Sequence, residues 1–149
     1  MLGLNTQVFI LVFGVTFVAL GLAAWSGLWK NWYWRSRGTV YGYVPLGLLF
    51  VLYAGNPWAQ GRPGPYYRLY QGLFVLLALC GVWWSLRPPA FVKPAWVRWL
   101  EAYPADVRQL ATKAVEQGAA WEPHVASQDK LDAWVKSLRK DKRKAKGGS

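Results

Sequence analysis

The sequence predicts an all-α integral membrane protein with three transmembrane helices, a short interfacial helix and a basic amphipathic cytoplasmic helical hairpin. Hydrophobic residues make up 54% of the 149 residues, and charged residues only 17%, below the roughly one quarter of a soluble domain. None of the seven acidic residues precedes Glu101. The basic residues, which give a net charge of +11, lie mostly toward the C-terminal end. An apolar first part and a basic second part follow from this pattern.

Three stretches predict the transmembrane helices, at residues 8–29, 40–58 and 69–86. None of them contains Asp, Glu, Lys, Arg or His, and a helix needs about 20 apolar residues to cross a hydrocarbon core of about 30 Å. Pro88 and Pro89 stop the third stretch. The first is longer than the apolar run of a cleaved signal peptide. We therefore expect a three-span transmembrane domain over residues 1–90 and a cytoplasmic helical extension over residues 91–149.

The loop charges predict the orientation. Three spans place the loop with Lys30, Arg35 and Arg37 on the same side as the basic C-terminal region. Loops rich in Lys and Arg stay in the cytoplasm. The N-terminus and the loop carrying Arg62 and Arg68 should then lie outside. The sequence thus predicts a multi-pass protein of the bacterial inner membrane, which is the plasma membrane, with a cytoplasmic C-terminus.

Aromatic residues gather where the predicted spans leave the membrane. Amphipathic rings favour the depth of the lipid headgroups. The expected interface anchors are Trp25, Trp29, Trp32, Trp34, Trp83, Trp84, Trp96 and Trp99. The five aromatic residues between positions 25 and 34 also allow a second interpretation, a binding surface for a quinone, a pigment or a partner helix.

Small residues predict a helix-packing face on the first span. Ala19, Ala23 and Gly27 recur every four residues, a spacing that lets helix backbones approach closely. Gly81 and Ser85 repeat this spacing in the third span. Such a face would serve contacts within the chain or between copies of it.

The region after residue 90 predicts short helices. Residues 95–102 favour a helix that lies in the headgroup plane, with a helix that packs against the tail as the alternative. Residues 105–121 form an amphipathic pattern, and a second helix begins at Ser127 or Asp129. The two can pair as a hairpin through Trp121 and Trp134.

A polybasic run closes the chain. Its basic residues are Lys136, Arg139, Lys140, Lys142, Arg143, Lys144 and Lys146. Such a run beside membrane spans binds anionic lipid at about 1 kcal/mol per charge, and a soluble protein partner is the alternative. No recognition helix or base-stacking sheet is predicted, so we do not expect specific nucleic-acid binding.

Catalytic chemistry is not expected. Cys80 and His124 are the only residues of their types, so a disulfide or a cysteine metal cluster cannot form within the chain. Motifs that bind phosphate or zinc, or that present a nucleophile, are absent. Proton and ion carriers use ionisable side chains at membrane depth, and the predicted spans have only polar residues such as Asn56 and Gln71. We expect no catalytic, cofactor-binding or metal-binding residues.

These observations favour a non-catalytic accessory or structural subunit that packs against a larger membrane assembly. Its expected partners are lipids, including anionic lipid, and other membrane subunits or copies of itself. A holin-type homo-oligomeric protein that permeabilises the membrane is one alternative. A small membrane enzyme or carrier completed by a partner chain is another, and Asn56, Gln71 or Glu122 would then contribute to its site.

Overall fold

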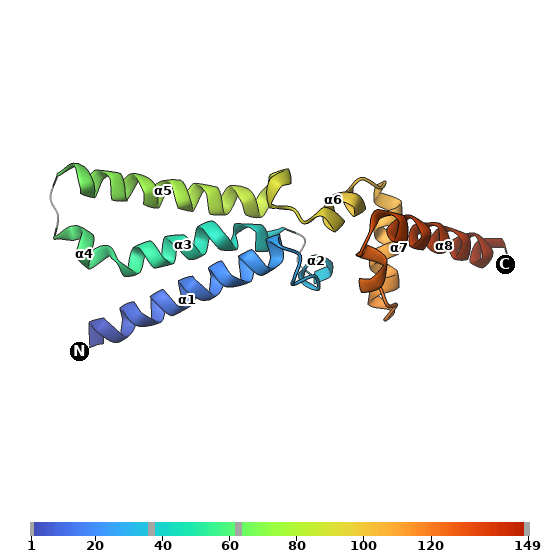
Figure 1. Ribbon diagram of the computed structural model, residues 1–149, viewed down its shortest axis with the longest axis horizontal. Helices are drawn as coiled ribbons and strands as arrows, with labels where there is room; N and C mark the ends of the chain where they lie inside the picture. Colours follow the sequence, from blue (N-terminus) through green and yellow to red (C-terminus); the bar gives the residue numbers. More distant parts are fainter. Residues whose placement is uncertain (1, 36–37, 62–63, 148–149) are drawn as a thin grey trace. The chain divides into compact units, whose positions relative to one another are not determined.

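The protein is described by a computed structural model over residues 2–35, 38–61 and 64–147, and within these over the side chains of residues 6–144. These residues form helices and loops and no strand, so the all-α prediction is confirmed for them. In chain order the helices are α1 (Leu2–Trp25), α2 (Trp32–Arg35), η1 (Thr39–Gly42), α3 (Tyr43–Ala54), α4 (Asn56–Gln60), α5 (Pro65–Leu86), η2 (Ala90–Val92), α6 (Ala95–Glu101), α7 (Ala105–Glu116), η3 (Glu122–Val125) and α8 (Gln128–Gly147) (Figure 1). The chain divides into two compact units, Met1–Val92 and Lys93–Ser149. Each unit is described by itself.

Unit 1 is built around α3, which lies between α1 and α5 (Figure 1). Glycine residues allow α3 to pack closely against α1. A Cβ atom on Gly47 would lie 2.7 Å from the carbonyl oxygen of Gly14 and 2.7 Å from the backbone nitrogen of Val18. A Cβ on Gly14 would lie 2.8 Å from the carbonyl oxygen of Gly47, and one on Gly21 would lie 2.9 Å from the nitrogen of Val44. The two helices therefore touch backbone to backbone.

The contact of α3 with α5 also depends on small residues. A Cβ on Gly42, at the start of α3, would collide with the Gly81 carbonyl oxygen and the Ser85 hydroxyl of α5. The Ser85 hydroxyl donates to the carbonyl of Gly81 at 2.8 Å and lies 3.3 Å from the carbonyl of Thr39. Gly81 is itself packed against Leu46 of α3. The small-residue pair that the sequence indicates in the third span thus lies at an internal helix contact.

The long apolar helices differ in extent from the predicted spans. Within the described part of the chain, two helices are long and apolar enough to cross a membrane, Thr6–Trp25 and Pro65–Leu86, and Thr39–Ala54 is shorter. The first ends at Trp25 because Gly27 takes a φ of 79° and the Trp29 N–H donates back to the Ala23 carbonyl. The second predicted span, residues 40–58, is interrupted at Gly55, which separates α3 from α4.

Unit 2 has a small core formed by α6, α7 and α8. Its fully buried residues include Val97, Leu100, Val107 and Leu131. Ser127 begins α8 as the sequence predicts, because its hydroxyl accepts the Lys130 N–H at 3.4 Å. The prediction of a helix over residues 105–121 is wrong at its end, since α7 stops at Glu116 and Gly118 turns the chain at a φ of 85°.

The prediction of an interfacial helix is not supported for α6. Trp96, Val97 and Leu100 are buried, and α6 contacts α8 within unit 2. An apolar face that is already covered by protein has nothing left to insert into a lipid headgroup layer. The alternative, a helix that packs against the tail, is the one that the structure favours.

Candidate functional site

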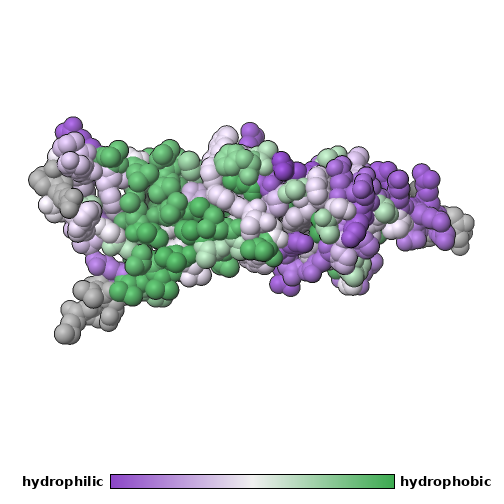
Figure 2. Space-filling view, viewed as in Figure 1, coloured by the Kyte–Doolittle hydropathy of each residue, from purple (hydrophilic) through white to green (hydrophobic). Residues whose placement is uncertain are grey.

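The most extensive feature of unit 1 is its exposed apolar surface. Hydrophobic residues gather over the long helices of this unit, whereas hydrophilic residues cover α8 (Figure 2). Only 17% of the apolar stretch of α1 and 6% of that of α5 is buried. Phe9 is 70% exposed on α1, and Leu69 is 73% exposed on α5. A surface of this kind requires cover by lipid or by another protein.

The structure separates the predicted interface anchors into two groups. Trp32 and Trp96 are 2% and 5% exposed and belong to the cores of their units, and their role as interface anchors stays a prediction. Trp32 packs edge-on against Tyr41 at a centroid distance of 4.9 Å. The other predicted anchors are at least partly exposed: Trp25, Trp29, Trp34, Trp83, Trp84 and Trp99. Their anchoring role stays a prediction.

The predicted packing face lies beside the observed one. Ala19 is exposed, and Ala23 and Gly27 are half-buried. The buried small residues of α1 are instead Gly14, Gly21 and Ala24. A contact between copies of the chain through Ala19, Ala23 and Gly27 stays a prediction.

The basic residues of the polybasic run on α8 point away from the core of unit 2. The exposed residues of this run are Lys136, Arg139, Lys140, Lys142, Arg143 and Lys144. The side chain of Lys146 lies outside the described residues, as do Arg37 and Arg62, on which the predicted orientation partly depends. The apolar residues Leu131, Trp134 and Val135 on the same helix are buried. Only the charged face of α8 is therefore exposed for contact with lipid or with a partner.

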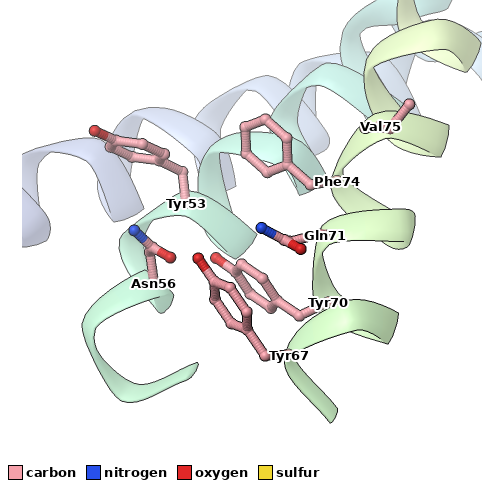
Figure 3. A pocket seen from close by; sticks show the side chains of 7 residues that line it. All are labelled: Tyr53, Asn56, Tyr67, Tyr70, Gln71, Phe74 and Val75. Atoms are coloured by element: carbon pink, nitrogen blue, oxygen red, sulfur yellow. The ribbon is translucent and has the colours of Figure 1, made fainter. Parts of the chain in front are cut away.

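A pocket of about 300 Å³ lies between the C-terminal end of α3 and the N-terminal part of α5 (Figure 3). Its lining residues are Tyr53, Asn56, Tyr67, Tyr70, Gln71, Phe74 and Val75. Asn56 approaches from the α4 side, and Tyr67, Tyr70 and Gln71 approach from α5. The pocket thus brings together Asn56 and Gln71, two polar residues that the sequence places in different predicted spans.

One hydrogen bond fixes the back of this pocket. The Tyr70 hydroxyl donates to the carbonyl of Leu52 at 2.5 Å. This carbonyl belongs to the last turn of α3 and also accepts the backbone N–H of Gly55 at 3.0 Å. The Tyr67 ring is stacked on that of Tyr70 at 6.4 Å and 9°. Tyr70 therefore ties α5 to α3, and Tyr67 is supported by it.

Sequence analysis missed the aromatic part of the pocket. Tyr67, Tyr70, Gln71 and Phe74 follow the i, i+3, i+4, i+7 spacing that places residues on one helix face. That spacing could have indicated a shared face. It could not have shown that Asn56 lies opposite, because this depends on how α3 and α5 are aligned.

Other candidate chemistry does not converge on a site. Within the described residues, no group of three or more His, Cys, Asp or Glu side chains could hold a metal ion. His124 is stacked on Trp134 at a centroid distance of 5.4 Å, and Lys93 pairs with Glu101 at 2.6 Å in unit 2. Cys80 is a half-buried free thiol.

Tyr103 carries a perturbed hydroxyl in unit 2. Burial, followed by a hydrogen bond that the phenol donates to the Asp132 carboxylate and by the negative charge of that carboxylate, raises the pKa of Tyr103 to about 12, while Arg139 opposes this. Tyr103 lies in the connection between α6 and α7, and Asp132 lies on α8. The bond therefore links this connection to α8.

We expect Tyr103→Phe to lower the stability of unit 2 at neutral pH by about 1.5 kcal/mol, the lower end for a hydrogen bond to a charged group, because Tyr103 is only half-buried. Because the pKa in the folded state is raised from 10.0, the contribution of this group is complete below pH 10 and is lost as the pH rises toward 12. Thermal unfolding of both proteins across this range measures the effect. Their stabilities should converge as the pH rises, and Tyr66→Phe, at a residue that is 71% exposed, is the control. Curves that run parallel up to the highest pH would contradict the assignment.

Fold and site together define an all-helical chain with two helices long and apolar enough to cross a membrane and a small polar pocket between α3 and α5. No known protein family matches this chain, and neither a curated protein nor a solved structure matches it.

Proposed function

We propose that this chain is a non-catalytic multi-pass membrane protein that acts as an accessory or structural subunit of a larger membrane assembly. The observation that carries the proposal is the exposure of the apolar stretches of α1 and α5, in which only 17% and 6% of the residues are buried. A helix at the core of a soluble protein has its apolar residues covered by neighbouring elements. Here lipid or a partner has to supply the cover.

The position of α3 supports a third pass. The four residues of η1 and the twelve of α3 extend over roughly 26 Å, slightly less than a hydrocarbon core of about 30 Å. However, α3 packs along both α1 and α5. If these two helices cross the bilayer, α3 lies at the same depth, and its short length is compensated because protein covers two of its sides. The inner-membrane location and the external N-terminus are proposed on loop charge alone.

The chemistry of the predicted spans supports a subunit more than an enzyme or a pump. They contain no Asp, Glu, Lys, Arg or His, the groups from which proton and ion relays are built. Anchoring groups are abundant instead, both as partly exposed Trp side chains on unit 1 and as the basic face of α8. A chain with many attachment points and no charged side chain in its predicted spans fits a role in assembly.

Purification tests this proposal. We expect the full chain to stay with membranes after an alkaline carbonate wash and to elute from a mild detergent together with at least one other membrane protein in fixed ratio. A chain released by carbonate would contradict membrane integration. A detergent-solubilised chain that elutes alone as a monomer would contradict the subunit role. Loss of membrane potential after induction, with elution as a homo-oligomer, would favour the holin-type alternative.

A further inference from the structure

We propose that the pocket between α3 and α5 binds the uncharged, oxygen-bearing headgroup of a membrane amphiphile, whose hydrocarbon chain lies along α5. This inference rests on the proposed membrane location of unit 1. It goes beyond the subunit role because it assigns a ligand class to a site.

The polar groups of the pocket are available to a ligand. Within the described residues, the side chains of Asn56, Tyr67 and Gln71 make no hydrogen bond, and all three extend toward the space of the pocket (Figure 3). Two carboxamides and a phenol offer both donors and acceptors. Tyr70 is different, because its hydroxyl is already used by the Leu52 carbonyl. Asn56, Tyr67 and Gln71 can therefore form hydrogen bonds with carbonyl or hydroxyl oxygens of a bound molecule.

The lining selects against a charged headgroup. Among the described residues that line the pocket, none is Lys, Arg, Asp, Glu or His. A phosphate at the depth of the hydrocarbon boundary needs a basic partner, because removing an unpaired charge from water is costly. An uncharged group needs only the hydrogen bonds that Asn56, Tyr67 and Gln71 offer. The site therefore fits a neutral amphiphile better than an anionic phospholipid.

The surface below the pocket fits a hydrocarbon chain. Val75 belongs to the pocket lining, and Leu79 and Val82 continue from it at a spacing of four and three residues, on one face of α5. These three side chains are 56%, 65% and 58% exposed. They extend over roughly 10 Å of helix. Gln71, six residues after Pro65, lies roughly 9 Å from the start of α5. The polar residues of the pocket would then lie near the membrane interface, and the exposed face formed by Val75, Leu79 and Val82 would lead toward the membrane interior.

Photo-crosslinking of the full chain in lipid nanodiscs tests the proposal. One arm uses a photoactivatable diacylglycerol and a second a photoactivatable prenyl quinone, two neutral sources of the same headgroup chemistry. A phosphatidylglycerol analogue with the same photoreactive group is the charged comparison. We expect saturable labelling of the peptide containing residues 67–75 by a neutral probe, and the arm that saturates identifies the source.

Matched variants separate a site from general lipid contact. Asn56→Leu and Gln71→Leu should each lower pocket labelling roughly fivefold, the loss expected for one hydrogen bond. Gln60→Leu, at an exposed amide of α4 outside the pocket lining, should not lower it. Gln71 is exposed, so its substitution leaves the core intact. Equal labelling in all four proteins, or equally saturable labelling by the anionic analogue, would overturn the proposal.

A hydrophobic carbene-generating reagent without a polar headgroup distinguishes the proposed membrane location of unit 1 from the proposed ligand site. It should label the exposed apolar residues of α1 and α5 in wild type and variants alike. If it does and the pocket is not labelled by a neutral probe, only the ligand site is refuted. If the carbene reagent fails to label these helices in membranes, the membrane location itself is refuted.

Discussion

Replacing Gly47 with alanine is expected to force α1 away from α3 and to lower the stability of unit 1 by about 1–3 kcal/mol, the usual cost of overpacking. The new Cβ would lie 2.7 Å from the Gly14 carbonyl oxygen and from the Val18 nitrogen, and 2.8 Å from the Val18 Cγ2 atom. Two of these atoms belong to the α1 backbone. A rotamer change cannot relieve such a contact, so the helix itself has to move.

Gly72→Ala is the matched control for this prediction. Gly72 lies on α5, and a Cβ built there has no atom within 4 Å. Alanine in place of glycine inside a helix is otherwise favourable by up to about 1 kcal/mol. Unfolding of the detergent-solubilised protein by a denaturing detergent should therefore move in opposite directions for the two variants. A Gly47→Ala protein as stable as Gly72→Ala would refute the close backbone contact.

The C-terminal end of α5 shows what the sequence predicts well, because Pro88 lies two residues after the last helical residue, Leu86, at which the predicted third span ends. The helix starts four residues before the predicted position 69, with Pro65 in its first turn, where the missing N–H costs nothing. The end of α1 precedes the predicted end at residue 29, because a glycine within a helix and a glycine that ends one differ only in φ, which is 79° at Gly27.

The helix contacts and the pocket depend on information that no single segment contains. Ala19, Ala23 and Gly27 have the spacing of a packing face, yet Gly14 and Gly21 are the glycines that meet α3. Which face is used depends on the alignment of α1 with Gly47, and this is a property of the pair. Asn56 and Gln71 were recognised as rare polar residues of the spans, but their meeting likewise follows from the alignment of α3 with α5.

Neutralising the outer face of α8 is expected to weaken its contact with anionic lipid on the order of a thousandfold. Lys136, Arg139, Lys140 and Arg143 follow the i, i+3, i+4, i+7 spacing and share one exposed face. Each contributes about 1 kcal/mol near an anionic surface, and each 1.4 kcal/mol is a factor of about ten. Replacing all four with glutamine should therefore remove more than half of the attraction, since Lys142, Lys144 and Lys146 keep their charge.

The measurement uses the full chain in liposomes of neutral or anionic lipid. A dye on Ser137→Cys, in a Cys80→Ser background, reports energy transfer to headgroup-labelled lipid. We expect transfer in anionic liposomes at low salt, clearly less transfer with the four-glutamine variant, and little transfer in neutral liposomes. Arg139→Lys with Arg143→Lys keeps the charge and should keep the signal.

The salt dependence of the energy-transfer signal distinguishes electrostatic attraction of α8 to the lipid from insertion of the helix into it. Leu131, Trp134 and Val135 form the apolar stripe of the helix, and all three are buried within unit 2. A helix without a free apolar face cannot insert below the headgroups, so the attraction has to be electrostatic. Since the Debye length falls from about 10 Å at 0.1 M salt to about 3 Å at 1 M, the signal should disappear at high salt. A signal that persists at 1 M salt would mean that the stripe leaves the core of unit 2 to enter the lipid.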